Sequence, residues 1–87
     1  ALNTNPFING RFVTQTVDQR ETKVFTFSGS DQVIDHGLGR TIQGIVEVNG
    51  VDCGVPPRIY MNPGSEDLTK QVNVSSATRG SCWIWVF

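Results

Sequence analysis

Apolar and polar side chains alternate with a period of two over much of the chain, which is the pattern of half-buried β-strands. Phe25 and Phe27 share one face of their segment, and Val72 and Val74 share one face of theirs. Short clusters of Gly, Pro, Asn and Asp separate these segments. The predicted strands cover residues 11–17, 22–28, 32–35, 42–49, 51–55, 58–61, 68–75 and 82–87.

One turn is predicted by a specific pair of residues. Asn49 and Gly50 both tolerate positive φ, which a type I′ hairpin turn requires at its two central positions. Residues 51–55 are therefore expected to pair back onto residues 42–49. The Pro-Pro pair that follows ends this strand or places it at a sheet edge, because proline cannot donate to a strand ladder.

The run over residues 82–87 is apolar on both faces. It predicts either a central strand that is covered on both sides or a strand whose second face meets another chain. Trp83, Trp85 and Phe87 share one of these faces. Because aromatic side chains favour cores and protein interfaces, we interpret these three as core or interface anchors rather than as a sugar-stacking platform.

The composition favours an all-β fold. Val occurs 11 times and Leu 3 times among 87 residues, with 9 Gly and 4 Pro. Such residues fit a pleated surface, while strong helix formers are scarce. We predict a small β-sandwich, or a partly open barrel, of about seven short and mostly antiparallel strands. Residues 11–87 are expected to form this one domain, and residues 1–10 an arm in which Phe7 and Ile8 dock onto an apolar surface.

Charge and hydropathy argue against two classes of partner. The net charge is −1 and the basic residues are scattered, whereas nucleic-acid binding needs a clustered basic face. No apolar run is long enough to span a membrane, and no signal peptide is recognised. We therefore expect neither nucleic-acid binding nor membrane association.

Residues 35–40 carry the residue types of a catalytic site. His36 is the only histidine of the chain, and Asp35 precedes it. Adjacent residues of an extended chain point to opposite faces, so Asp35 is badly placed to orient the His36 ring for acid–base chemistry. The Gly-Leu-Gly step lacks the helix and the lysine of a phosphate-binding loop. We expect no enzyme activity and no small-molecule substrate.

The same segment predicts a specific turn instead. Gly37 and Gly39 give the backbone the freedom that a tight turn needs, and Leu38 between them can anchor the turn in a core. We interpret His36 and Arg40 as hydrogen-bonding clamps of this turn. Arg40 is expected to pair with a nearby carboxylate or with a neighbouring subunit.

The two cysteines, Cys53 and Cys82, lie far apart in the sequence. A disulfide requires their Cβ atoms to lie about 3.8 Å apart, which a sequence does not reveal, so their pairing stays open. Together with one histidine they lack the ligand spacing and the fourth ligand of a zinc site. We expect no metal and no cofactor.

The order of these features resembles a known group of proteins. A strand leads into His-Gly-Leu-Gly-Arg at residues 36–40, a short step follows into an Ile/Val-rich strand, and a Trp-rich strand comes last. This order resembles that of small β-sandwich proteins and domains of tailed-bacteriophage virions, and the matching stretches are residues 33–40, 44–48 and 83–87. The family pattern has proline two positions after the arginine, where this chain has Ile42.

The resemblance implies a virion component in which the motif stabilises the fold. We therefore expect a non-enzymatic structural protein of the virion, assembled in the bacterial cytoplasm, in the tail or at a fibre-attachment point. It would bind other virion proteins and copies of itself in a trimeric or higher cyclic assembly. A capsid decoration protein and a carbohydrate-binding module are the alternatives. The expected interface residues are Phe7, Ile8, Phe12, Trp83, Trp85 and Phe87.

Overall fold

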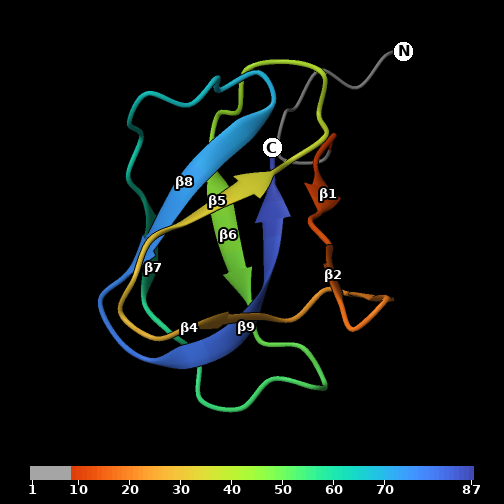
Figure 1. Ribbon diagram of the computed structural model, residues 1–87, viewed down its shortest axis with the longest axis vertical. Helices are drawn as coiled ribbons and strands as arrows, with labels where there is room; N and C mark the ends of the chain where they lie inside the picture. The colour runs from red at the N-terminus through yellow and green to blue at the C-terminus, as the bar shows by residue number, and fades with distance from the viewer. Residues whose placement is uncertain (1–8) are drawn as a thin grey trace.

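Short antiparallel strands build the part of the chain that the structure describes. The computed structural model describes residues 9–87, which hold nine strands and no helix (Figure 1). This confirms the predicted all-β class, and the arrangement is that of a small β-sandwich. The strands are β1 Arg11–Phe12, β2 Gln15–Val17, β3 Arg20–Thr22, β4 Phe25–Phe27, β5 Gln32–Asp35, β6 Ile45–Val48, β7 Ile59–Met61, β8 Gln71–Ser76 and β9 Gly80–Val86.

Strand β9 is the centre of the larger sheet. It pairs with β1, β4 and β6, all antiparallel. Trp85 lies opposite both Phe12 of β1 and Val46 of β6, so these two strands occupy opposite edges of β9. Nearer the start of β9, Cys82 lies opposite Phe25 of β4. The apolar run at residues 82–87 is thus central in its sheet, and one of its faces fills the core. The other face, which carries Trp83, Trp85 and Phe87, is only half-buried, so the predicted covering on both sides is not confirmed.

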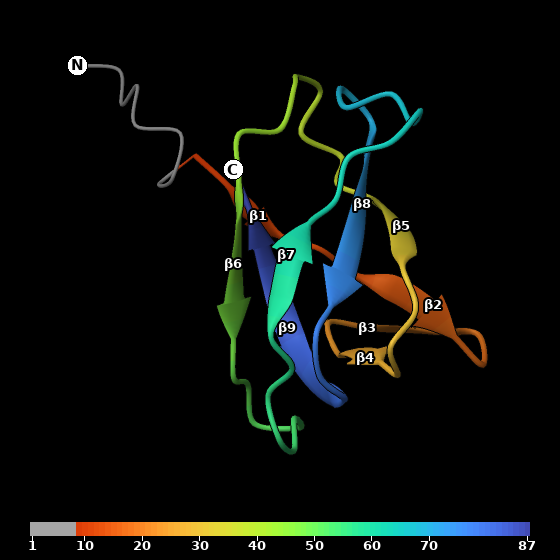
Figure 2. The same ribbon diagram turned by 90° about the vertical axis from the view of Figure 1, so that its left-hand side faces the viewer.

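The second sheet has the order β5-β8-β7, with β8 in the middle. Ile34 of β5 lies opposite Val72, and Met61 of β7 lies opposite Val74. Seen from the side, β6, β1 and β9 lie on one side of the molecule and β8 and β5 on the other (Figure 2). Strand β5 has the predicted bounds, while β8 begins at Gln71 because residues 68–70 form a turn before it.

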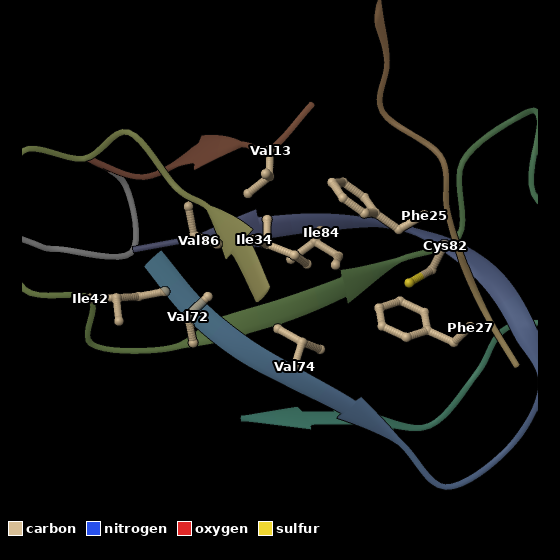
Figure 3. Packing of buried hydrophobic residues seen from close by; sticks show 10 residues of the cluster. All are labelled: Val13, Phe25, Phe27, Ile34, Ile42, Val72, Val74, Cys82, Ile84 and Val86. Carbon is tan, nitrogen blue, oxygen red and sulfur yellow. The ribbon is translucent and has the colours of Figure 1, made fainter. Parts of the chain in front are cut away.

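The core lies between the two sheets and takes its side chains from both of them (Figure 3). The predicted inward faces of β4 and β8 are confirmed, since Phe25, Phe27, Val72 and Val74 are all buried. Strand β9 contributes every second residue. The buried cluster consists of Val13, Phe25, Phe27, Ile34, Ile42, Val72, Val74, Cys82, Ile84 and Val86.

A hairpin interrupts the first predicted strands. Residues 11–17 were expected to be continuous, but β1 pairs with β9 whereas β2 leaves that sheet and pairs with β3. The turn between β2 and β3 is made by Asp18 and Gln19, whose φ angles are 52° and 65°. Two consecutive positive φ angles match the right-handed twist of a two-residue hairpin. The sequence does not reveal this turn because neither residue is glycine.

The predicted hairpin at Asn49 and Gly50 is wrong. Residues 51–55 contain no strand, and β6 pairs with β9 instead. Gly50 is not among the residues with positive φ. Its lack of a side chain serves a different purpose, because a Cβ atom there would lie 2.1 Å from Cε2 of Trp83. The glycine thus makes room for an aromatic ring and does not form a hairpin turn.

The central position of β9 leads to a stability prediction. Ile84 is fully buried between the sheets, so Ile84→Ala is expected to lower the free energy of unfolding by about 2–5 kcal/mol through lost burial and the cavity left behind. Val33→Ala, at a side chain that is 57% exposed, should change it by no more than about 0.5 kcal/mol. Urea unfolding followed by tryptophan fluorescence measures both, and equal effects would contradict this account of the core.

Candidate functional site

The outer face of the larger sheet carries a cluster of aromatic side chains. Because successive residues of a strand point to opposite faces, the burial of Ile84 in the core directs Trp83 and Trp85 outward. Directly opposite residues of paired strands share a face, which adds Phe12, Val46 and Val48. All of these residues are half-buried. The aromatic face, as we call it, comprises Phe12, Val46, Val48, Trp83, Trp85 and Phe87.

Edge-to-face packing holds the rings of this face in place. The Phe12 ring lies 5.6 Å from the Trp83 ring and 5.0 Å from the Trp85 ring, and both interplanar angles are 81°. The T-shaped arrangement places the positive edge of one ring against the negative face of another. Lys23 Nζ lies 5.1 Å from the centroids of both the Phe12 and the Trp83 rings. The ammonium group is thus attracted to two rings at once.

Three glycines provide the surfaces on which the outer rings rest. A Cβ atom at Gly50 would lie 2.1 Å from Trp83, one at Gly10 would lie 2.6 Å from Trp85 Nε1, and one at Gly44 would lie 2.7 Å from Phe87. Each ring therefore contacts bare backbone at van der Waals distance. The aromatic face is a fixed surface because its rings pack on backbone that lies just before β1 and on either side of β6.

The segment around His36 forms a turn around one backbone carbonyl. His36 is 1% exposed. Its Nε2 lies 2.8 Å from the carbonyl oxygen of Leu68, which also accepts the amide of Ile42 at 3.1 Å. The Nδ1 atom accepts the amide of Leu38 at 3.1 Å. This pattern fits the tautomer with the proton on Nε2, and neither ring nitrogen faces a reacting group.

The two glycines of this turn adopt positive φ angles, which glycine adopts readily. Gly37 and Gly39 have φ of 64° and 72°, a region that L side chains rarely adopt. Leu38 between them is half-buried and packs against the core. Arg11 Nη1 donates to the carbonyl of Gly37 at 3.5 Å, which joins the turn to β1.

Arg40 pairs with neither Asp31 nor Asp35, the two carboxylates that precede it in this part of the chain. Its Nη1 donates to the carbonyl of the next residue, Thr41, at 3.5 Å. Asp35 accepts a hydrogen bond from Gln71 at 2.9 Å, and Asp31 accepts from three side chains, two on β8 and one in the connection between β7 and β8. Within residues 9–87 the buried Nη2 of Arg40 has no hydrogen-bond partner.

The expected docking residues of the arm and the two cysteines remain to be placed. Phe7 and Ile8 lie outside the described residues. Cys53 and Cys82 are free thiols, and burial, followed by the charge of Glu47 and Cys53, raises the pKa of Cys82 to about 12. Among the described residues no three His, Cys, Asp or Glu side chains are grouped as metal ligands.

Two clefts flank the β2–β3 hairpin. One of about 460 Å³ lies between the hairpin and β4, and one of about 410 Å³ lies between β2 and β5. His36 lines neither of them. Its ring is enclosed by the turn and not presented to a cleft.

A polar cluster fixes the turn that precedes β5. Asp31 accepts hydrogen bonds from Ser75 Oγ, from Asn73 Nδ2 at 3.1 Å and from Asn62 Nδ2 at 3.3 Å. These hydrogen bonds, led by that of Ser75, lower the pKa of Asp31 below its ordinary value of 3.8. Asn73 Nδ2 also donates to the Asn62 carbonyl at 3.0 Å. The cluster ties one sheet edge to the middle of the same sheet.

Sequence reasoning missed several members of the aromatic face. Val46 and Val48 share one face of their strand by alternation, but only the pairing with β9 places them beside the tryptophans. Lys23 gave no signal, because its position follows from the unexpected hairpin. Gly44 and Gly50, close to an aromatic-rich strand in space but far from it in sequence, could be recognised only once the register of β6 and β9 was known.

Comparison with models of known protein families, with curated proteins and with solved structures finds no match. Residues 9–87 contain no helix of the length and hydropathy that crossing a membrane would require.

The close contact between Gly50 and the Trp83 ring is tested by a matched pair of variants. Gly50→Ala forces a methyl group into the indole ring, so we expect a loss of about 1–3 kcal/mol in the free energy of unfolding and a shift in tryptophan fluorescence. At Gly54 a Cβ atom meets nothing within 4 Å, so Gly54→Ala should change stability by at most about 1 kcal/mol. Wild-type stability and fluorescence in Gly50→Ala would show that the ring is not seated there.

The Asp31 cluster leads to a pH dependence of stability. Because the folded-state pKa of Asp31 lies below 3.8, its contribution is fully present above that pH and is lost as the pH falls through the folded-state value. Urea unfolding at a series of acidic pH values should therefore show a smaller loss of stability in Asp31→Asn than in wild type. High salt should leave this difference in place, since hydrogen bonds and not distant charges lower the pKa. Identical acid profiles would contradict the assignment.

Proposed function

We propose that this chain is a non-enzymatic structural subunit of a bacteriophage virion, in the tail or at a fibre-attachment point, that acts by binding other protein chains. The observation that carries the proposal is the aromatic face. A contiguous group of Trp, Phe and Val side chains, fixed in position on the outside of a sheet, has the composition of the apolar centre of a protein interface. The described residues of the expected interface, Phe12, Trp83, Trp85 and Phe87, all belong to it.

The His36 turn supports the same proposal from a second direction. In the bacteriophage proteins that the sequence resembles, the His-Gly-Leu-Gly-Arg motif is expected to stabilise the fold. In this chain the His36 ring joins Leu38 to Leu68 by two hydrogen bonds to backbone atoms. A motif whose role is to stabilise the fold is consistent with a protein that acts by assembling with other chains.

Small size supports self-association. A chain of this length buries only roughly 60% of the surface that its unfolded form exposes, so a single core gives it limited stability. An interface of standard size, about 1,600 Å² in total, would add apolar burial around the aromatic face. Cyclic symmetry is the usual way in which identical subunits close such contacts.

The alternatives differ in what the aromatic face would meet. A capsid decoration protein would use the same face at a symmetry axis of the capsid lattice. A carbohydrate-binding module would need an open ring face for a sugar to stack on. Trp83 lacks one, because the Gly50 backbone lies against the ring and Lys23 Nζ lies over it. At Trp83 the packing therefore favours a protein partner over a sugar.

Self-association through this face is tested by the mass of the protein in solution. Wild type should sediment as a trimer or a larger closed ring. Val48→Glu places a charge beside Trp83 on the aromatic face and should shift the protein to the monomer. Tyr60→Glu, at a 50% exposed side chain of the other sheet, should leave the assembly intact. A wild-type monomer at every concentration, which purified virion proteins also fail to bind, would contradict the proposal.

A further inference from the structure

The outer face of the β5-β8-β7 sheet differs from the aromatic face in composition. Ile34, Val72 and Val74 point into the core, and Ile59 and Met61 pack against it, so alternation directs their neighbours outward. Because β5 and β8 lie on the other side of the molecule from β6 and β1 (Figure 2), this face points away from the aromatic face. The outward side chains of the three strands are Val33, Asp35, Gln71, Asn73, Ser75 and Tyr60.

Tyr60 is the aromatic side chain of this face. It is 50% exposed, and within residues 9–87 no aromatic ring and no cation packs on its ring. The Trp83 ring, in contrast, has Lys23 Nζ over it and the Gly50 backbone against it. Half of the Tyr60 side chain is therefore accessible to a ligand that stacks on an aromatic ring.

Ser75 connects the Tyr60 ring to an amide and a carboxylate. It lies directly opposite Tyr60, so the two side chains are neighbours on this face. The Ser75 hydroxyl donates to Asp31 Oδ1 and accepts from Asn62 Nδ2 at 3.2 Å. Asn62 follows Tyr60 by two positions and therefore shares its face. The ring, the amide and the carboxylate thus surround one buried hydroxyl group.

Hydrogen bonds hold this amide and this carboxylate in place before any ligand binds. Asp31 Oδ2 accepts from Asn62 Nδ2 at 3.3 Å and from Asn73 Nδ2 at 3.1 Å. The backbone amide of Asn62 donates to the Asn73 carbonyl at 2.8 Å. Polar groups that are fixed in advance lose little conformational entropy when a ligand binds to them.

The fixed groups retain acceptor positions that the fold does not use. A carboxylate has about four lone-pair positions, and three donors reach Asp31. Asn62 Oδ1 accepts no hydrogen bond within residues 9–87. Asp31 and Asn62 are both exposed. Because hydrogen bonds, led by that of Ser75, lower the pKa of Asp31, this carboxyl group is ionised at neutral pH and only accepts.

These features favour a neutral ligand that is rich in hydroxyl groups. The carboxylates of Asp31 and Asp35 on this face disfavour an anion. Tyr60 and Val33 alone supply too little apolar surface for a hydrophobic ligand. A pyranose ring has one face of C–H groups, which packs on an aromatic ring, and a rim of hydroxyl groups, which donate to fixed acceptors. A carbohydrate therefore matches both the ring and the acceptors beside it.

We propose that Tyr60, Asn62 and Asp31 form a carbohydrate-binding site on the outer face of the second sheet. The Tyr60 ring stacks on a pyranose, and Asn62 Oδ1 and the Asp31 carboxylate accept hydrogen bonds from its hydroxyl groups. An open site with one stacking ring is expected to bind with a dissociation constant on the order of 1 mM. The site is separate from the aromatic face, and the proposal stands whether or not the chain is a virion subunit.

The test is an NMR titration of the whole chain with maltohexaose, cellohexaose and chitohexaose. At least one of these glycans should shift the backbone amide signals of Tyr60, Asn62 and Ser75, while those of Trp83 and Trp85 stay in place. Tyr60→Ala should weaken binding by about tenfold or more, and it should fold because the side chain is half exposed. Tyr60→Phe keeps the ring and is the matched control, for which the affinity should stay within about threefold of wild type.

Two further variants separate this site from the aromatic face. Asn62→Ala removes one acceptor and should weaken glycan binding by about threefold to tenfold. Val48→Glu, which is expected to break up the assembly, should bind the glycan as wild type does, so the proposed assembly and the glycan site fail independently. No shift with any of the three glycans, or equal binding by wild type and Tyr60→Ala, would overturn the proposal. Loss of self-association in Tyr60→Ala would also overturn it, because this face would then bind a protein.

Discussion

The structure depends above all on the pairing of β9. Its neighbours β1, β4 and β6 each hydrogen-bond to it, and within residues 9–87 every strand pairing of the larger sheet includes it. Alternation along the same strand divides its side chains between two tasks. Cys82, Ile84 and Val86 fill the core, while Trp83 and Trp85 form the outer aromatic face. One strand thus fixes both the interior of the molecule and the surface proposed to bind partners.

The fold depends secondly on the hydrogen bonds that the carbonyl of Leu68 accepts. It receives the His36 ring and the amide of Ile42, so the chain between them closes into a loop on a single acceptor. Histidine suits this position because one ring nitrogen can donate while the other accepts. Residue types that suggest chemistry are used here to satisfy buried backbone groups, which would otherwise destabilise the fold. The pairing of Asp35 with Gln71, away from the ring, agrees with this use.

The sequence predicts those features that depend on local pattern. Alternation places Phe25, Phe27, Val72 and Val74 inward, and the type of residue at positions 37 and 39 accounts for positive φ there. It does not predict features that depend on contacts between distant segments. The local sequence Asn49-Gly50 predicts a hairpin turn. The glycine is instead required because the ring of Trp83, which is remote in the sequence, packs against it. The turn at Asp18 and Gln19 lacks the usual glycine signal, so the β2–β3 hairpin and the cleft beside it became visible only in the structure.

The order of the strands along the chain has a consequence for how the molecule folds. Strand β9 follows β1, β4 and β6, and it supplies the pairing that each of them needs. During synthesis these three strands leave the ribosome well before their shared partner does. The larger sheet therefore forms only after residue 86 has emerged, and its folding is dominated by the closure of long loops. Until then the unpaired edges and apolar faces of β4 and β6 are open to other chains, which makes the moment when β9 arrives decisive for whether the chain folds or aggregates.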